Sequence, residues 1–131
     1  SLGVIMLEID NLRDFDGNFS SEAGATILRT VADFLSRHTR KEDIASRYGD
    51  NEFVLILMDA TLDLTLQRAE KLREEIKALR VPSGQPINIS AGVASFPDHG
   101  RTPDTLLEAA DSALLTARSG GRDQVSVALS G

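Results

Sequence analysis

The chain has 131 residues, of which 41% are hydrophobic and 26% charged, and this length and composition fit one globular domain with a single core. Its 14 Lys and Arg residues against 20 Asp and Glu residues give a formal net charge of -6, the wrong sign for binding a polyanion by counterion release. Bulk nucleic-acid binding is therefore disfavoured, whereas a small basic pocket for one phosphorylated ligand is not. The chain has no cysteine, which excludes disulfides, thiolate zinc sites and a cysteine nucleophile.

The chain opens with a strand pattern that is followed by a helix pattern. Residues 2–9 are an apolar run that predicts a buried strand, and residues 10–21 after it are polar and turn-prone. From Ile27 onward, apolar residues recur at the spacing of a helix with one buried face. We expect this helix to end near residues 38–41.

A hairpin and a second helix follow. Residues 44–48 and 52–58 predict two short strands, because each is rich in residues that favour strands. The intervening Gly49, Asp50 and Asn51 tolerate positive φ angles and therefore suit a tight turn. Apolar residues spaced by three and four positions over 62–79 predict a helix.

The last third of the chain completes the predicted fold. Residues 87–94 resume as a strand, and Thr102-Pro103 is the start signal of a third helix, with an N-cap followed by proline. Ser119-Gly120-Gly121 ends that helix, and residues 124–129 form a last strand. The order β-α-β-β-α-β-α-β predicts an α+β, two-layer, ferredoxin-like fold, in which helices cover one face of a mostly antiparallel sheet.

Neither a membrane span nor a signal peptide is predicted. The longest apolar run, residues 53–58, is far shorter than the ~20 residues of a membrane helix. Residues 1–7 lack a basic leader and a cleavage site, and are predicted to be a core strand. A chain that opens directly into a core strand suggests a piece of a longer polypeptide.

Acidic residues follow the first strand and flank the predicted hairpin turn. Strands one and three of a βαββ unit are neighbours, so Glu8 and Asp10 are expected to face Asn51 and Glu52. Oxygen ligands that converge from two strand ends resemble the magnesium platform of phosphoryl-transfer enzymes. The alternative is that these are ordinary polar residues at strand ends.

Two arginines flank the end of the third predicted helix. Arg118 and Arg122 are four positions apart and are candidates to pair with phosphate groups. Cations near a helix C-terminus also interact favourably with the helix dipole, so a purely structural role stays open.

Several segments resemble the GGDEF domains, the diguanylate cyclases that condense two GTP molecules into cyclic di-GMP. The hairpin Arg47-Tyr48-Gly49-Asp50-Asn51-Glu52-Phe53 resembles the family's R-Y-G-G-D/E-E-F. Further segments that agree in order and spacing are Leu7-Glu8-Ile9-Asp10-Asn11-Leu12-Arg13, Ile89-Ser90-Ala91-Gly92-Val93-Ala94, and Ala110-Asp111-Ser112-Ala113-Leu114 through Gly121-Arg122-Asp123. The resemblance implies a single GGDEF-like domain over residues 1–131 that lacks the family's N-terminal D-x-L-T-G-L-x-N-R segment.

The resemblance also shows departures at the metal-binding and catalytic positions. The third residue of the signature, a metal-binding carboxylate in the family, is Asn51 here, and of the hairpin carboxylates only Glu52 is retained. The strand-one aspartate is replaced by Glu8, which reaches one methylene further. By resemblance, Glu8, Ile9 and Glu52 remain as weak metal ligands, for Mg²⁺ if GTP binding or activity persists.

The phosphate positions are better preserved than the catalytic ones. Gly49 is present, but the second glycine of the signature is Asp50, and a carboxylate there repels a polyphosphate by about 1 kcal/mol at 4 Å in water. The family's phosphate cations are matched by Arg13, Arg118 and Arg122. Their presence implies that a nucleotide still visits the site.

The positions that read guanine in the family are altered. Asp16 stands where the family has an asparagine, and it can still accept hydrogen bonds from guanine. Ala25 stands where the family has an aspartate, and it offers no polar group. By resemblance, these two positions and the altered hairpin positions all contact the same bound GTP.

A second ligand site is intact by resemblance. Arg40 and Asp43 form an R-x-x-D motif at the spacing of the family's inhibitory site, which binds cyclic di-GMP. A guanidinium can form paired bonds with phosphate or guanine, and a carboxylate can accept from guanine. Lys71 replaces a further ligand arginine but lacks its planar fork. The alternative is a surface ion pair of little energetic value.

These features together predict a degenerate GGDEF domain of cyclic di-GMP signalling, with weak or absent cyclase activity, that acts as a regulatory or cyclic di-GMP-binding module. The alternatives are an active cyclase and a structural dimerisation or docking domain. The resemblance implies cyclic di-GMP and GTP as ligands, a homodimer, sensor or EAL-type domains in the same parent chain, and a cytoplasmic location even where the parent is membrane-anchored.

Overall fold

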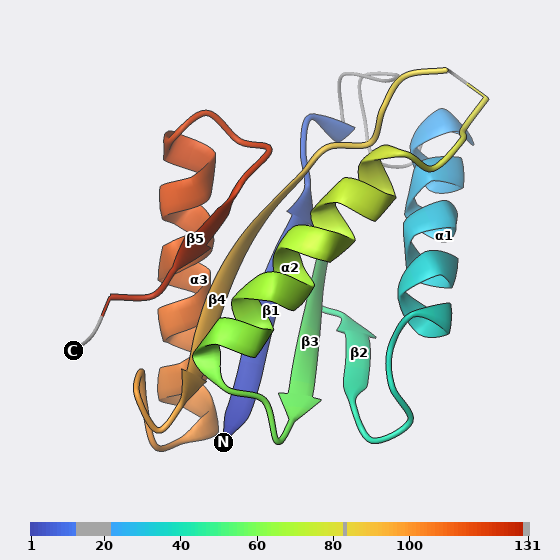
Figure 1. The fold of residues 1–131 in the computed structure, drawn as a ribbon. Helices are drawn as coiled ribbons and strands as arrows, with labels where there is room; N and C mark the ends of the chain where they lie inside the picture. Colours follow the sequence, from blue (N-terminus) through green and yellow to red (C-terminus); the bar gives the residue numbers. More distant parts are fainter. Residues whose placement is uncertain (13–21, 83, 130–131) are drawn as a thin grey trace.

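The computed structural model describes residues 1–12, 22–82 and 84–129, and eight regular elements lie within these ranges (Figure 1). In chain order they are β1 (Leu2–Ile9), α1 (Glu22–Arg37), β2 (Ile44–Arg47), β3 (Glu52–Met58), α2 (Leu62–Lys77), β4 (Ile89–Phe96), α3 (Pro103–Ser119) and β5 (Val125–Val127). This is the order that the sequence predicts.

The five strands form one sheet in the order β2-β3-β1-β4-β5. β1 pairs antiparallel with β3 and β4, β2 pairs antiparallel with β3, and β5 pairs parallel with β4. The predicted α+β class, the mostly antiparallel sheet and the hairpin are confirmed. The β1–β3 register sets Glu8 opposite Glu52, which brings the strand-one and hairpin motifs to the same edge of the sheet.

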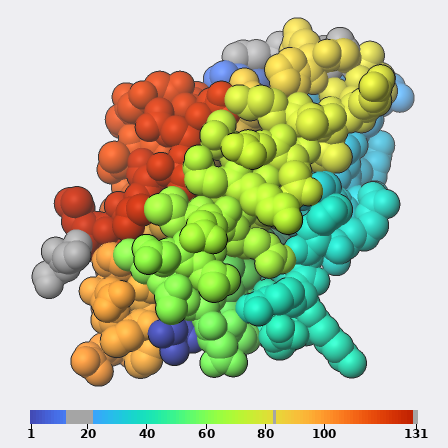
Figure 2. All heavy atoms as spheres, in the orientation of Figure 1, coloured from blue at the N-terminus to red at the C-terminus, as the bar shows by residue number. Residues whose placement is uncertain are grey.

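Both faces of the central strands are buried, and helices lie on both sides of the sheet. Ile5, Leu7 and Ile9 belong to a core shared with α1 and α2, whereas Val4 and Met6 belong to a core shared with α3. α1 and α2 therefore cover the face seen in Figures 1 and 2, and α3 covers the opposite face. The structure differs here from the two-layer prediction, because an apolar strand that alternates between two faces needs a cover on each.

Local signals explain how α3 begins and how closely it packs. The Thr102 hydroxyl accepts from the Thr105 N–H, and the Thr105 hydroxyl accepts from the Thr102 N–H, so the two form a capping box in front of Pro103. Gly92 of β4 faces α3, where an added Cβ would lie 2.1 Å from the carbonyl oxygen of Ala110. The glycine is therefore required by the close approach of helix and strand.

Some element boundaries differ from the prediction. α1 begins at Glu22, five residues before the first apolar residue of its stripe, and ends at Arg37. β4 runs over residues 89–96 rather than 87–94, and β5 is limited to 125–127. None of the helices in the described ranges has the length and apolar character needed to cross a bilayer.

On the α3 side of the sheet, α3 covers Val54 of β3 but leaves β2 and Ile56 of β3 partly open. α3 packs on β4, β1 and β5, so Ile44 and Tyr48 remain about half exposed, at 54% and 56%. Beside them, a cleft of about 330 Å³ is lined mostly by apolar side chains, among them Leu2, Ile56 and Phe96. We call this region the open face.

Candidate functional site

The signature hairpin and the end of β1 meet at the upper edge of the sheet in Figure 1, where β3 begins and α3 ends. We call this the hairpin site. It contains Glu8 and Glu52, which the sequence predicts to lie together, and the structure confirms that contact through the strand register. Asp10 does not face the hairpin as predicted, because its carboxylate turns toward β4 and the turn after α3.

The hairpin turn is held by the arginine that precedes it. The Arg47 guanidinium donates from Nε to the Gly49 carbonyl at 2.9 Å and from Nη2 to the Asp50 carbonyl at 2.6 Å, while the Tyr48 N–H donates to the Glu52 carbonyl at 2.8 Å. None of residues 48–51 has a positive φ angle. The predicted hairpin turn is present, but it does not use the positive φ angles that Gly49, Asp50 and Asn51 tolerate, so Asp50 in place of glycine introduces no backbone strain of that kind.

Asn51 joins the hairpin to the end of β1 through two hydrogen bonds. Its side-chain Nδ2 donates to the Ile9 carbonyl at 3.0 Å, and the Ile9 N–H donates to the Asn51 carbonyl at 3.0 Å. The reverse orientation of the amide would place two acceptor oxygens against each other, so the Ile9 carbonyl fixes which way the amide points. Sequence reasoning noted the loss of a carboxylate at this position but not the bond that replaces it.

Glu8 is buried and is matched by the two arginines at the end of α3. Its side chain is 8% exposed, and Oε1 lies 3.5 Å from Arg118 Nε and 3.4 Å from Arg122 Nη1. The structure therefore brings both predicted phosphate cations to this site. In the absence of an anionic ligand they neutralise the carboxylate that was expected to hold a metal.

Glu52 lies beside Glu8 in a different electrostatic environment. Burial, the neighbouring charges of Glu8 and Asp111, and a hydrogen bond with Glu8 raise the pKa of Glu52, and Arg118 offsets this only in part. The like charge of Glu8 directly opposite is therefore one of the physical causes of the raised pKa of Glu52.

Asp10 holds the turn that carries Arg122. Its side chain is 1% exposed, and it accepts from the Ser90 hydroxyl at 2.6 Å and from the Asp123 N–H at 2.9 Å. Arg122 and Asp123 both have positive φ, at 65° and 48°, a conformation that non-glycine residues adopt only with support. Asp10 supplies part of that support.

Asp123 forms ion pairs with α2 that the sequence did not predict. Its carboxylate pairs with Arg73 at 3.0 Å and with Lys77, both on α2. Burial alone would raise the pKa of Asp123, but the hydrogen bonds and charges of these two partners outweigh it, so the pKa is lowered. The spacing of about 50 positions between the partners gives no local signal from which the pairing could have been predicted.

The residues at the hairpin site do not fit a divalent metal. Mg²⁺ needs near-octahedral oxygen ligands, but the Ile9 carbonyl is occupied by an N–H donor and Glu8 carries two guanidinium groups. Among the residues that the structure describes, there is no group of three or more His, Cys, Asp or Glu side chains arranged to hold a metal ion.

The remaining nucleotide residues are placed unequally. Arg13 and Asp16 lie outside the described residues, so their predicted contacts stay predictions. Ala25 lies in the first turns of α1 and is partly buried. Gly49 has room around it, because an added Cβ would meet only Glu52, at an ordinary 3.7 Å.

The R-x-x-D motif lies at the other end of β3, and we call it the Arg40 site. Arg40 donates from Nε to Asp43 Oδ2 at 2.8 Å, from Nη2 to Oδ1 at 3.0 Å, and from Nη2 to the Met58 carbonyl at 2.8 Å. The Met58 N–H donates to Asp43 Oδ1 at 2.9 Å. The pair therefore clamps the α1–β2 loop to the end of β3.

Asp43 is buried, whereas Arg40 is partly open. The Asp43 side chain is 0% exposed and that of Arg40 is 41% exposed. Burial alone would raise the pKa of Asp43, but the bonds from Arg40 and from the Met58 N–H outweigh it, so this pKa is lowered. No described residue accepts a hydrogen bond from Arg40 Nη1, so this edge of the guanidinium is available to a ligand.

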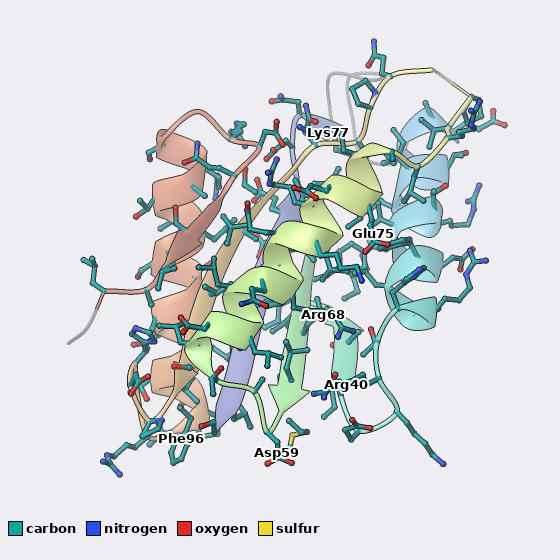
Figure 3. All side chains as sticks on the ribbon, in the orientation of Figure 1. Arg40, Asp59, Arg68, Glu75, Lys77 and Phe96 are labelled. Atoms are coloured by element: carbon teal, nitrogen blue, oxygen red, sulfur yellow. The ribbon has the colours of Figure 1, made fainter. Side chains whose placement is uncertain are left out.

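Arg68 of α2 is a further cation near this site. Figure 3 shows Arg68 between α2 and the upper part of β2, and Arg40 beside the lower end of β2. Arg68 donates to the His38 carbonyl, and its charge helps to lower the pKa of Asp43. Sequence reasoning named Lys71, which is exposed one turn further along α2. Arg68 was missed because its role depends on how α2 crosses the sheet.

Comparisons with known proteins decide the family. The sequence profile described as "Diguanylate cyclase, GGDEF domain" matches residues 1–124. This chain belongs to the GGDEF family. Its domain is thus of the diguanylate cyclase family, which belongs to cyclic di-GMP signalling.

Individual relatives agree with this assignment. Diguanylate cyclase DosC of Escherichia coli K12 is 32% identical over 130 residues, which cover 95% of this chain and 28% of DosC. The GGDEF domain of TpbB (YfiN) from Pseudomonas aeruginosa is 26% identical with a TM-score of 0.89, over 98% of this chain and 82% of that one. The DgcB GGDEF domain from Caulobacter crescentus, solved in complex with c-di-GMP, shares the fold at 24% identity, with a TM-score of 0.82 over 96% and 74% of the chains. The chain spans about a third or less of the curated relatives it matches.

Proposed function

We propose that this GGDEF domain is a poor or inactive diguanylate cyclase that acts as a regulatory module by binding cyclic di-GMP at Arg40 and Asp43. The observation that carries the proposal is the state of the Arg40 guanidinium. A buried carboxylate and a backbone carbonyl hold it in place, its side chain is 41% exposed, and no described residue accepts a hydrogen bond from its Nη1. A pre-positioned guanidinium loses little freedom when it binds phosphate or guanine.

The hairpin site supports the other half of the proposal. Cyclisation of GTP needs a metal against the triphosphate, and here Asn51 supplies a hydrogen-bond donor where the family has a carboxylate. Asp50 adds a negative charge on the turn, and Ala25 removes a guanine contact. All three changes weaken the binding or the reaction of the same nucleotide.

Calorimetric titration with cyclic di-GMP and with GTP tests the binding site. We expect cyclic di-GMP to bind, Arg40→Ala to weaken it at least tenfold, and Lys71→Ala to weaken it by a smaller factor. Arg29→Ala is the matched control, because Arg29 is an exposed arginine on α1, and binding should be unchanged. Unfolding of each variant is measured in parallel, since Arg40 also supports the fold. Equal binding by Arg40→Ala, or binding of GTP alone, would refute this site.

An assay of cyclic di-GMP formation from GTP and Mg²⁺ tests the catalytic half. The Glu8–Glu52 pair and the retained Arg118 and Arg122 favour residual cyclase activity as the second candidate function. Robust product formation by the full-length protein would establish that alternative. Under our proposal the protein is slow or silent, and Asn51→Asp combined with Asp50→Gly raises the rate.

A further inference from the structure

We propose that Asn51 takes the place of a divalent cation in this chain: its amide ties the hairpin to the end of β1 through the Ile9 carbonyl, and it excludes metal from that point. The inference deepens the proposed loss of cyclase activity, because it assigns the substituted residue a structural role instead of a mere absence. It concerns the hairpin site alone and makes no use of the Arg40 site.

The first step of the argument is the bond itself. A backbone carbonyl is a ligand that hard cations accept, and it is also a hydrogen-bond acceptor. At 3.0 Å from Ile9, Asn51 Nδ2 directs an N–H at that oxygen. A cation placed there would face the positive end of the N–H dipole, so amide and cation compete for the same oxygen.

The second step is the pair of strands that the bond connects. The Ile9 N–H also donates to the Asn51 carbonyl at 3.0 Å, so each residue both donates to and accepts from the other. Glu8 and Glu52, one position before Ile9 and one after Asn51, are opposite each other in the ladder. Asn51 thus extends the β1–β3 pairing by one position, beyond the last pair of the strands.

The third step is the charge around the bond. Arg118 and Arg122 already flank Glu8 Oε1 at 3.5 and 3.4 Å, and Arg122 Nη1 also lies 3.7 Å from Asp10 Oδ1, so the buried carboxylate is paired with cations without metal. A carboxylate at position 51 would add a negative charge beside Glu8 and Glu52 and would place an oxygen against the Ile9 carbonyl. A bridging cation favours such an arrangement, and the amide makes that cation unnecessary.

Thermal unfolding of the 131-residue chain in EDTA and in Mg²⁺ tests the inference. We expect the same Tm for the wild type in both conditions. In EDTA, the Tm of Asn51→Asp should be about 4 °C or more below that of the wild type. Mg²⁺ should restore much of this loss in Tm. Asn51→Ala is the matched control: it also loses the bond to Ile9 and unfolds lower, but Mg²⁺ should not restore it.

A second measurement covers the case in which Asn51→Asp folds poorly. Paramagnetic Mn²⁺ should leave the amide NMR signals of Ile9 and Glu52 sharp in the wild type and broaden them in Asn51→Asp. Both measurements are repeated with GTP, because Mg²⁺ and Mn²⁺ are often held jointly by carboxylates and substrate phosphates.

Three results would overturn the inference. They are a wild type stabilised by Mg²⁺ or broadened by Mn²⁺ at these residues, an Asn51→Asp variant as stable as wild type in EDTA, and a destabilised Asn51→Asp variant that metal neither stabilises nor broadens. Failure of the chain to bind cyclic di-GMP would refute the Arg40 site instead, and it would leave every one of these readings unchanged.

Discussion

The two ends of β3 hold two charged sites that differ in how their charges are satisfied. At the hairpin site, Glu8 is paired with Arg118 of α3 and with Arg122 of the turn after α3, and the Ile9 carbonyl accepts a hydrogen bond from Asn51. At the Arg40 site, a buried carboxylate holds a guanidinium that is still partly open to solvent. The two sites are separated by the seven residues of β3, about 20 Å of strand. At one site the charged groups pair with each other, and at the other a guanidinium is partly exposed to solvent.

The difference teaches that the presence of family residues at a site does not show whether they are free to bind a ligand. By resemblance, the hairpin site has more of these residues, including Gly49, Glu52 and Arg122, with Arg118 at a lysine position. In the absence of ligand, however, its cations are bound by its own acid. A ligand there must first separate internal ion pairs, whereas a ligand at Arg40 adds to contacts that are already formed.

The largest expected effect is on stability at the Arg40 site. Asp43→Ala leaves the Met58 N–H and the Arg40 guanidinium without their buried partner, so we expect a loss of about 2 kcal/mol in the free energy of unfolding. Urea denaturation measures it. Glu42→Ala is the control, because Glu42 is an exposed partner of the same arginine at 3.5 Å and should change stability by less than about 0.5 kcal/mol. Equal losses for the two variants would contradict the role given to the buried carboxylate.

How far the sequence predicts this structure depends on how local each feature is. The strand order, the hairpin and the start of α3 were predictable, since periodicity, turn residues and the Thr102-Pro103 signal are each contained within a few positions. The side of the sheet that α3 covers was not, because it depends on both faces of β1 and β4 at once.

The candidate sites show the same limit. The meeting of Glu8 with Glu52 follows from the neighbouring strands and was predicted correctly. The Asn51–Ile9 bond and the Asp123 pairs with α2 join residues 42 to 50 positions apart. Nothing in the spacing of those residues indicates which side-chain atom points where.

The pH dependence of stability should have opposite signs at the two sites. The lowered pKa of Asp43 means that its contribution is present above its ordinary value of 3.8 and is lost as the pH falls through the folded-state pKa. Stability should therefore drop on acidification below about pH 4 in wild type, and this drop should shrink in Asp43→Asn. Denaturation midpoints between pH 2 and pH 6 check it, and an unchanged slope in the variant would show that other carboxylates dominate.

The smallest expected effect is at Glu52. Its raised pKa means that stability is greatest with the proton bound and is lost as the pH rises from 4.5 through the folded-state pKa. Glu52→Gln removes a like charge opposite Glu8, and we expect a gain of about 0.5 kcal/mol at neutral pH. Below pH 4.5 the gain should vanish. A loss of stability at neutral pH would mean that the Glu52 charge is needed by Arg118.

The open face of β2 and β3 sets a condition on the solution behaviour of the domain. Ile44, Tyr48 and the cleft beside Phe96 form an apolar area rimmed by polar residues, a kind of surface that promotes contact between copies. Reversible self-association through these surfaces would make the affinity measured for a ligand depend on the protein concentration in the calorimeter. Titrations at decreasing protein concentration should converge on one dissociation constant. Ile44→Lys should give that same constant at every protein concentration. Together these results would separate ligand binding from self-association through the open face.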